Sequence, residues 1–289
     1  MVHSHNAKKG KHNLKNVLIV VGVVVLIALG VVGFIFFRPP QEASAPIEAL
    51  PLDLASPTPE EEESTEGTTD NGYGEAETTP DASSTAEPTE TTGDTGDTAE
   101  PTASDAEPAA GEPLLFEIVP AESQARFLID EVLQGDPITV VGNTDQVAGQ
   151  IAIDPNDPTA SQVGTIQVNA RTITTDNEFR NRAIKNVILQ TDAHEFVTFV
   201  PTNISGLPES GSVGESYTLQ ITGDLTVAGT TNPITFDATV TPVSEERIEG
   251  NASASLLYTD FNLFIPDSPS VDTVADEVRL ELDFVAERI

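Results

Sequence analysis

The sequence predicts an all-β domain, built as an antiparallel barrel of about eight strands with one inserted amphipathic helix. A single transmembrane helix and a disordered linker precede it. Three observations lead to this prediction: an uncharged apolar run near the N-terminus, a long acidic stretch rich in Pro, Thr and Glu, and a period-two alternation of apolar and polar residues through the rest. The 289 residues therefore divide into a basic tail (1–16), the apolar run (17–37), the linker (38–113) and the C-terminal domain (114–289).

The net charge of −34 is distributed unevenly along the chain. Residues 1–38 are basic and contain no Asp or Glu, residues 39–113 are acidic and contain no Lys or Arg, and residues 114–289 are acidic with a few basic side chains. A protein that binds nucleic acid needs clustered Lys and Arg to contact phosphates, so we expect no nucleic-acid partner. The chain has no Cys, which excludes disulfides, thiolate metal sites and a cysteine nucleophile.

The apolar run at residues 17–37 has the length of a membrane-spanning helix. Its 21 residues carry no charge, and at about 1.5 Å per residue they span roughly the 30 Å hydrocarbon core of a bilayer. Four lysines precede the run and only Arg38 follows it directly, which predicts a single-pass cell-membrane protein with a cytoplasmic N-terminus and an extracytoplasmic C-terminal domain. A cleaved secretory signal is the alternative, but its apolar region is ordinarily shorter.

Residues 38–113 have the composition of a disordered linker. Pro, Glu, Asp, Thr, Ser, Ala and Gly dominate, and Tyr73 is the single aromatic residue. Such a segment buries too little apolar surface to offset the entropy lost on ordering. We interpret it as a stalk that lifts the C-terminal domain away from the membrane.

The C-terminal domain shows the alternation of strands with one wet and one dry face. It is clearest over 166–171, 217–227, 234–241 and 278–287, with clusters of Gly, Pro, Asn and Asp between these runs. An eight-stranded closed barrel would protect its edges and leave room for one small ligand. A filled β-sandwich is the competing architecture.

One segment, residues 176–190, has helical rather than strand periodicity. Thr175 followed by Glu178 three positions later is typical of a capping box. Phe179 begins an apolar stripe with the spacing of one helix face. We therefore predict an amphipathic helix packed over the sheet or across one end of a barrel.

Three stretches resemble a known family. Residues 123–127 (SQARF) are similar to its opening strand, residues 170–176 (ARTITTD) with Arg180 and Asn181 to its strand-to-helix junction, and residues 222–236 (TGDLTVAGTTNPITF) to its central hairpin. The chain from 114 onward resembles the YceI-like family, the lipid- and polyisoprenoid-binding proteins of bacterial envelopes. The resemblance implies a lipocalin-like antiparallel barrel whose apolar lumen holds an isoprenoid or fatty chain, without catalysis.

The residues offer no convincing catalytic or metal site. His194 is the only His outside the N-terminal tail, and the acids match no ligand spacing, so we predict no enzyme activity, no metal and no cofactor. Arg180 either pairs with Asp176 one turn earlier or reaches a ligand headgroup, and we favour the pair. The candidate ligand-binding residues are Phe127, Ile129, Ile166, Val168, Phe179, Arg180, Tyr217, Leu219, Ile221, Phe236 and Phe284.

Two functions follow from these predictions. The first is a membrane-anchored, extracytoplasmic protein that binds a long-chain apolar lipid such as a polyisoprenoid. The alternative is a structural or protein-interaction module of the cell envelope whose barrel is filled by its own side chains.

Overall fold

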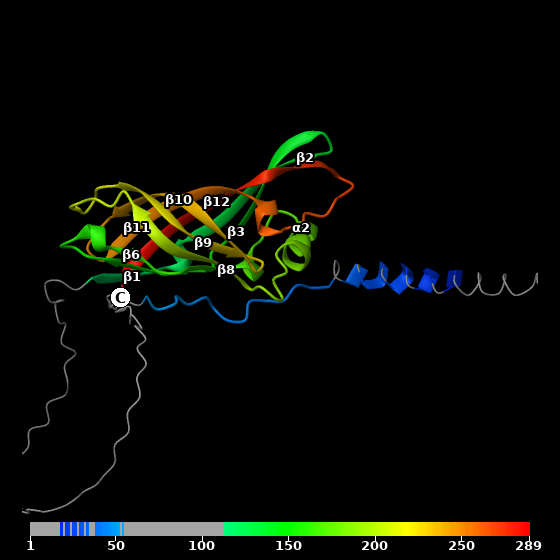
Figure 1. Cartoon of the computed structure of the whole chain (residues 1–289), viewed down its shortest axis with the longest axis horizontal. Coiled ribbons are helices and arrows are strands. Elements are labelled where there is room, and N and C mark those ends of the chain that lie inside the picture. Colours follow the sequence, from blue (N-terminus) through cyan, green and yellow to red (C-terminus); the bar gives the residue numbers. More distant parts are fainter. Residues whose placement is uncertain are drawn as a thin grey trace, which may run out of the picture. The chain divides into compact units, whose positions relative to one another are not determined.

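The computed structural model describes residues 18–34 except 20, 24, 28 and 32, residues 38–52, residue 54 and residues 113–289. The C-terminal domain is one antiparallel sheet of twelve strands with few helices (Figure 1). The strands are β1 (Leu114–Ile118), β2 (Gln124–Leu133), β3 (Asp136–Thr144), β4 (Val147–Ala148), β5 (Gln150–Ile153), β6 (Gln162–Val163), β7 (Ile166–Asn169), β8 (Phe196–Ser205), β9 (Tyr217–Val227), β10 (Thr230–Pro242), β11 (Arg247–Leu257) and β12 (Val271–Arg288). The helical elements are η1 (Pro120–Glu122), η2 (Pro158–Ala160), η3 (Ala170–Thr172), α2 (Glu178–Ala183), the π-helical η4 (Ile184–Ile188) and η5 (Tyr258–Phe261).

The long strand β12 pairs with β11 along one edge and with both β1 and β2 along the other, where the sheet curls. The strands follow the order β4-β7-β8-β9-β10-β11-β12-β1-β5-β6, and β2 with β3 joins the remaining free part of β12. The C-terminal end of β12 therefore pairs with β1 and the rest of that edge with β2. Beyond β7 the chain returns to β3, where the backbones of Asn143 and Thr174 exchange two hydrogen bonds of 3.0 Å.

The predicted all-β antiparallel fold is confirmed, but the number of strands differs. We predicted about eight strands, and the sheet has twelve. Between Val147 and Asn169 the chain forms four strands of only two to four residues. Alternation over so few residues cannot be distinguished from a loop, which explains the difference.

The inserted helix is present, but it starts later than predicted and changes type. The α-helix α2 runs for six residues and continues as the π-helix η4. The predicted cap at Thr175 is wrong, because the Asn177 side chain accepts hydrogen bonds from the backbone N–H groups of Phe179 and Arg180. Thr175 instead donates its hydroxyl to the buried Asn181 Oδ1 at 2.8 Å.

Residues 38–52, which we call the strap, run along the outside of the domain in an extended conformation (Figure 1). The Asn186 side-chain amide donates to the Arg38 carbonyl at 2.9 Å, and Arg38 forms an ion pair with Asp192. At the other end, the Leu52 backbone N–H donates to Gln150 Oε1 on β5 at 2.8 Å.

Further contacts hold the middle of the strap. The Ser44 backbone N–H donates to Glu195 Oε1 at 2.8 Å, Arg171 donates to the Glu42 carbonyl, and Ile47 is buried. The prediction of a disordered linker beginning at residue 38 is therefore wrong for the strap, and residues 55–112 lie outside the described residues. The strap ends against β5, and β1, which follows the undescribed stretch, pairs with the same β5.

The described positions between residues 18 and 34 are helical and almost all exposed. Their large side chains are apolar, from Leu18 to Phe34. In the part of the chain that the structure describes, no helix is both long and apolar enough to cross a membrane. Residues 17, 20, 24, 28, 32 and 35–37 of the predicted transmembrane helix, and the basic tail 1–16, lie outside the described residues.

Candidate functional site

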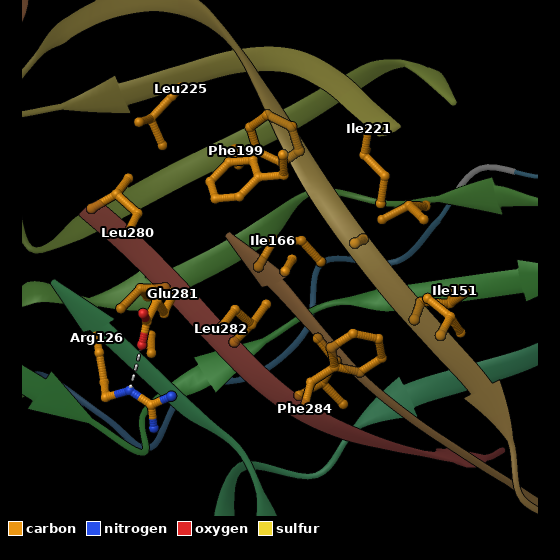
Figure 2. Close-up of a pocket in the computed structure, with 18 of the residues that line it drawn as sticks. Arg126, Ile151, Ile166, Phe199, Ile221, Leu225, Leu280, Glu281, Leu282 and Phe284 are labelled. Carbon is orange, nitrogen blue, oxygen red and sulfur yellow. Dashed lines mark hydrogen bonds and ion pairs between the residues drawn. The ribbon is translucent and has the colours of Figure 1, made fainter. Parts of the chain in front are cut away.

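The inner face of the curled sheet encloses a cavity of about 640 Å³. Because successive side chains of a strand point to opposite faces, the apolar member of each alternating pair points inward. Figure 2 shows side chains of β8, β9 and β12, among them Phe199, Ile221 and Leu282, converging on one space. The volume falls within the roughly 300–1,000 Å³ of small-molecule sites.

Ten of the eleven predicted site residues line this cavity, and one does not. Phe179 of α2 is 72% exposed and is absent from the lining, so its predicted inward orientation is wrong. The helix turns Arg180, Ile184 and Ile188 toward the cavity instead. The predicted residues that the structure brings together are Phe127, Ile129, Ile166, Val168, Arg180, Tyr217, Leu219, Ile221, Phe236 and Phe284.

Three phenylalanines of the lining lie against a glycine of the neighbouring strand. A Cβ built on Gly142 would come within 2.1 Å of the Phe127 ring, and one on Gly250 within 2.6 Å of the Phe284 ring. The Phe199 ring lies over Gly223 in the same way. Each ring thus occupies the space of a missing side chain rather than the middle of the cavity, which helps to keep the cavity open.

An ion pair lies where α2 meets the sheet. Arg180 Nη2 donates to Glu131 Oε1 on β2 at 2.8 Å, and its Nη1 pairs with Asp176. Glu131 is buried and lines the cavity, whereas Asp176 is exposed. The predicted pair of Arg180 with Asp176 is confirmed, but the sequence did not reveal Glu131 as the buried partner. Glu131 occupies an apolar-face position of β2, in register with Phe127 and Ile129, and this position could have identified it as a buried charge that needs a partner.

A second ion pair lies at the margin of the cavity. Arg126 donates from Nε to Glu281 Oε2 at 3.2 Å, as Figure 2 shows, and also pairs with Asp283. Burial opposes the charge of Arg126, but the hydrogen bonds and attraction from Asp283 and Glu281 outweigh it and raise the pKa of Arg126. The guanidinium therefore stays charged and is held by two carboxylates of β12.

The candidate residues chosen from the sequence did not include many of the aliphatic side chains that line the cavity. Leu280 and Leu282 alternate with Phe284 on the same face of β12, and all three line the cavity. That alternation could have identified the two leucines together with Phe284. Leu263 and Ile265, which follow η5, lie in a segment without periodicity and carried no such signal.

His194 lies outside the cavity lining. Its ring covers the β9–β10 turn, where a Cβ on Gly229 would approach it to 2.7 Å. Among residues 38–52 and 113–289 and the described positions before them, no three His, Asp or Glu side chains gather to hold a metal ion.

Comparison with known proteins agrees with the family resemblance of the sequence. The family model described as the YceI-like domain matches residues 116–286. No curated protein matches the chain.

Three solved structures are similar to this chain. BcnA of Burkholderia cenocepacia is 18% identical, with a TM-score of 0.46 over 58% of this chain and 98% of that protein. A polyisoprenoid binding domain from Saccharophagus degradans, implicated in plant cell wall breakdown, is 13% identical, with a TM-score of 0.48 over 61% and 99%. The YCEI protein of Campylobacter jejuni is 19% identical, with a TM-score of 0.42 over 51% and 84%. Since the family model covers more than half of the sequence, the chain belongs to the YceI-like domain family.

Proposed function

We propose that the protein binds a long-chain apolar lipid, such as a polyisoprenoid, inside the cavity, and that it acts as a carrier or store rather than as an enzyme. The observation that supports this most strongly is the lining of the cavity, which consists chiefly of aliphatic and aromatic side chains from most strands of the sheet. Such a lining favours hydrocarbon, because each buried CH₂ group contributes about 0.8 kcal/mol. Ten such groups would contribute roughly 8 kcal/mol before the cost of ordering the ligand.

The charged groups of the cavity support a ligand held mainly by its hydrocarbon part. Arg180 is paired with Glu131 and Asp176, and Arg126 with Glu281 and Asp283. Both guanidinium groups are thus already matched by carboxylates, and Arg288, which also lines the cavity, lies 3.8 Å from Glu246. A ligand with a small or neutral polar end fits this arrangement better than one that needs a free cation.

The alternative function, a module whose barrel is filled by its own side chains, is less well supported. The inner face leaves a cavity of about 640 Å³. The rings of Phe127, Phe199 and Phe284 lie against glycines of the neighbouring strands, and larger residues at those positions would push the rings further into this cavity. A lumen built only for stability would be packed, because empty apolar space costs stability.

We further propose that residues 17–37 anchor the protein in the cell membrane, with a cytoplasmic N-terminus and an extracytoplasmic domain. The uncharged run, the preceding lysines and the exposed apolar side chains between Leu18 and Phe34 support this. Extraction of membranes with alkaline carbonate tests the anchor: the full chain should stay with the lipid, and a chain lacking residues 1–37 should be released. Release of both would contradict the anchor.

Lipid binding in the cavity is tested by blocking the cavity in the full chain. Ile221→Trp adds bulk to an inward position of β9, and Gln220→Trp adds the same bulk to the neighbouring exposed position. We expect the first variant to lose most binding of a fluorescent polyprenol and the second to keep it. Equal binding by both variants would mean that the lipid does not occupy the cavity.

A further inference from the structure

The two ends of the cavity differ in their surface chemistry. The strand β8 begins shortly after η4 and ends before the 206–216 loop, so η4 and this loop lie at opposite ends of the cavity that both help to line. Leu189, which follows η4, packs in one cluster with Phe261 of η5. We call the end formed by α2, η4, η5 and residues 263–265 the helical end, and the opposite one the loop end.

Two phenylalanines at the helical end point away from the protein. Phe179 of α2 is 72% exposed and Phe264 is 68% exposed. Each adjoins residues that line the cavity: Arg180 follows Phe179, and Leu263 and Ile265 flank Phe264. Exposing large apolar side chains to water at the mouth of an apolar cavity costs free energy. Contact with a hydrocarbon phase removes this cost.

The same end carries two cations without a close carboxylate. Arg182 and Lys185, both half-buried, are the basic residues of the stretch 113–289 that form no ion pair, although the charge of Glu178 attracts Lys185. The Arg182 guanidinium lies 6.0 Å from the centre of the Phe179 ring. The loop end places Asp154, Glu245 and Arg288 beside the cavity, and the helical end also exposes Asp176, Glu178 and Asp260. Exposed aromatic rings with basic side chains are typical of elements that lie in a lipid interface.

The strap ties this end to the chain that precedes it. Arg38, the first strap residue, is held by Asp192 and Asn186, next to η4. Its backbone N–H donates to the Phe34 carbonyl at 3.0 Å. Four Cα–Cα steps reach at most about 15 Å. A bilayer that held residues 17–37 would therefore lie close to the helical end.

We propose that the helical end rests on the bilayer that holds residues 17–37, with Phe179 and Phe264 in the interface and Arg182 and Lys185 at the lipid phosphates. A lipid then passes between the bilayer and the cavity through this end without crossing water. This inference rests on the proposed membrane anchor and lipid binding. It replaces the predicted stalk, because the strap keeps the domain at the membrane rather than away from it.

A fluorescence experiment on the full chain tests the contact. The protein has no Trp, so a single introduced Trp reports from one place. We choose Phe179→Trp and Phe264→Trp at the helical end and, as the control, Val243→Trp at the loop end, where Val243 is 39% exposed and lies outside the cavity lining. Each variant is reconstituted into vesicles of phosphatidylcholine and phosphatidylglycerol, with or without bromine on the acyl chains.

The helical-end variants should lose roughly half of their fluorescence to brominated lipid, because a side chain about 5–10 Å deep in the interface lies within reach of bromine. The Val243→Trp variant should not change. If all three stay bright while the protein floats with the vesicles, the contact is refuted and the anchor stands. If the protein does not float with the vesicles, the anchor fails and the contact fails with it.

Charge reversal tests the cations separately. Arg182→Glu with Lys185→Glu should slow the uptake of a fluorescent polyprenol from these vesicles about tenfold or more, because each basic residue at an anionic surface contributes about fivefold. Uptake from detergent micelles without phosphate headgroups should not change. Equal slowing in micelles would indicate damage to the cavity and would contradict the proposed role of the two cations.

Discussion

Arg180 on α2 and Glu131 on β2 join the inserted helix to the sheet through an ion pair of 2.8 Å. Glu131 is buried, so its carboxylate depends on this guanidinium for compensation. The pair also closes one corner of the cavity, because both side chains belong to its lining. This polar contact therefore helps to fix the position of α2 and, with it, the shape of the cavity at this end.

Removing the guanidinium should destabilise the domain strongly. We expect Arg180→Met to lower the free energy of unfolding by about 3 kcal/mol, because it leaves a buried carboxylate unpaired. Asp176→Asn is the matched control: Asp176 is 82% exposed, and an exposed pair contributes less than about 1 kcal/mol. Denaturant unfolding measures both. The double variant Arg180→Met with Glu131→Leu should recover most of the loss, and failure to recover would show that Glu131 is not the cause.

Filling the space beneath Phe127 should reduce lipid binding. In Gly142→Ala the three atoms nearest the new methyl group all belong to the ring of Phe127, and this ring would have to turn into the cavity. We expect a destabilisation of about 1–3 kcal/mol and a marked loss of bound polyprenol. Val141→Ala is the control, since Val141 is the neighbouring position of β3, is exposed and lies outside the cavity lining. Unchanged lipid binding in Gly142→Ala would show that the ring position does not control the cavity.

Docking of the strap should weaken at acid pH through Glu195. Burial opposes the charge of this carboxylate, but hydrogen bonds from Ser44 and Asn169 and the charge of Arg171 outweigh it and lower its pKa. A lowered pKa stabilises the folded state above the unfolded value of about 4.3, and the contribution disappears as the pH falls through the lower folded value. The difference in unfolding free energy between the wild type and Glu195→Gln should thus be largest near neutral pH and shrink below pH 4. A difference that is constant with pH would contradict this role.

The strap should also depend on one buried side chain. Ile47 is buried, whereas Leu50 on the same strap is exposed. Ile47→Ser should speed amide hydrogen exchange at Ser44 and Leu52, because the loss of an apolar side chain contact worth about 1.5–3 kcal/mol loosens the segment. Leu50→Ser should leave this exchange unchanged. Equal effects of the two variants would mean that burial of Ile47 does not hold the strap.

The sequence predicted features that depend on local patterns, and it failed where contacts are distant along the chain. The alternation around Leu219 and Phe236 identified inward-facing positions, because the two-residue period of a strand determines which side chains share a face. Helical periodicity made Phe179 a candidate lining residue, but the helix is capped by Asn177 rather than Thr175 and turns Arg180 toward the cavity.

The strap shows the same limit more clearly. Its composition is typical of disorder, yet its backbone is held by side chains of Asn186, Glu195 and Gln150, more than 90 positions further along the chain. Composition reports how much apolar surface a segment can bury by itself. It does not report polar partners that a folded neighbour supplies.

Whether the cavity holds a lipid is decided by native mass spectrometry of the full chain released from mild detergent. We expect the wild type to carry a hydrophobic ligand of discrete mass, one per chain, and Ile221→Trp to appear at the mass of the protein alone. A wild type that appears only at its own mass, in preparations from cells and after incubation with polyprenol, would contradict the claim.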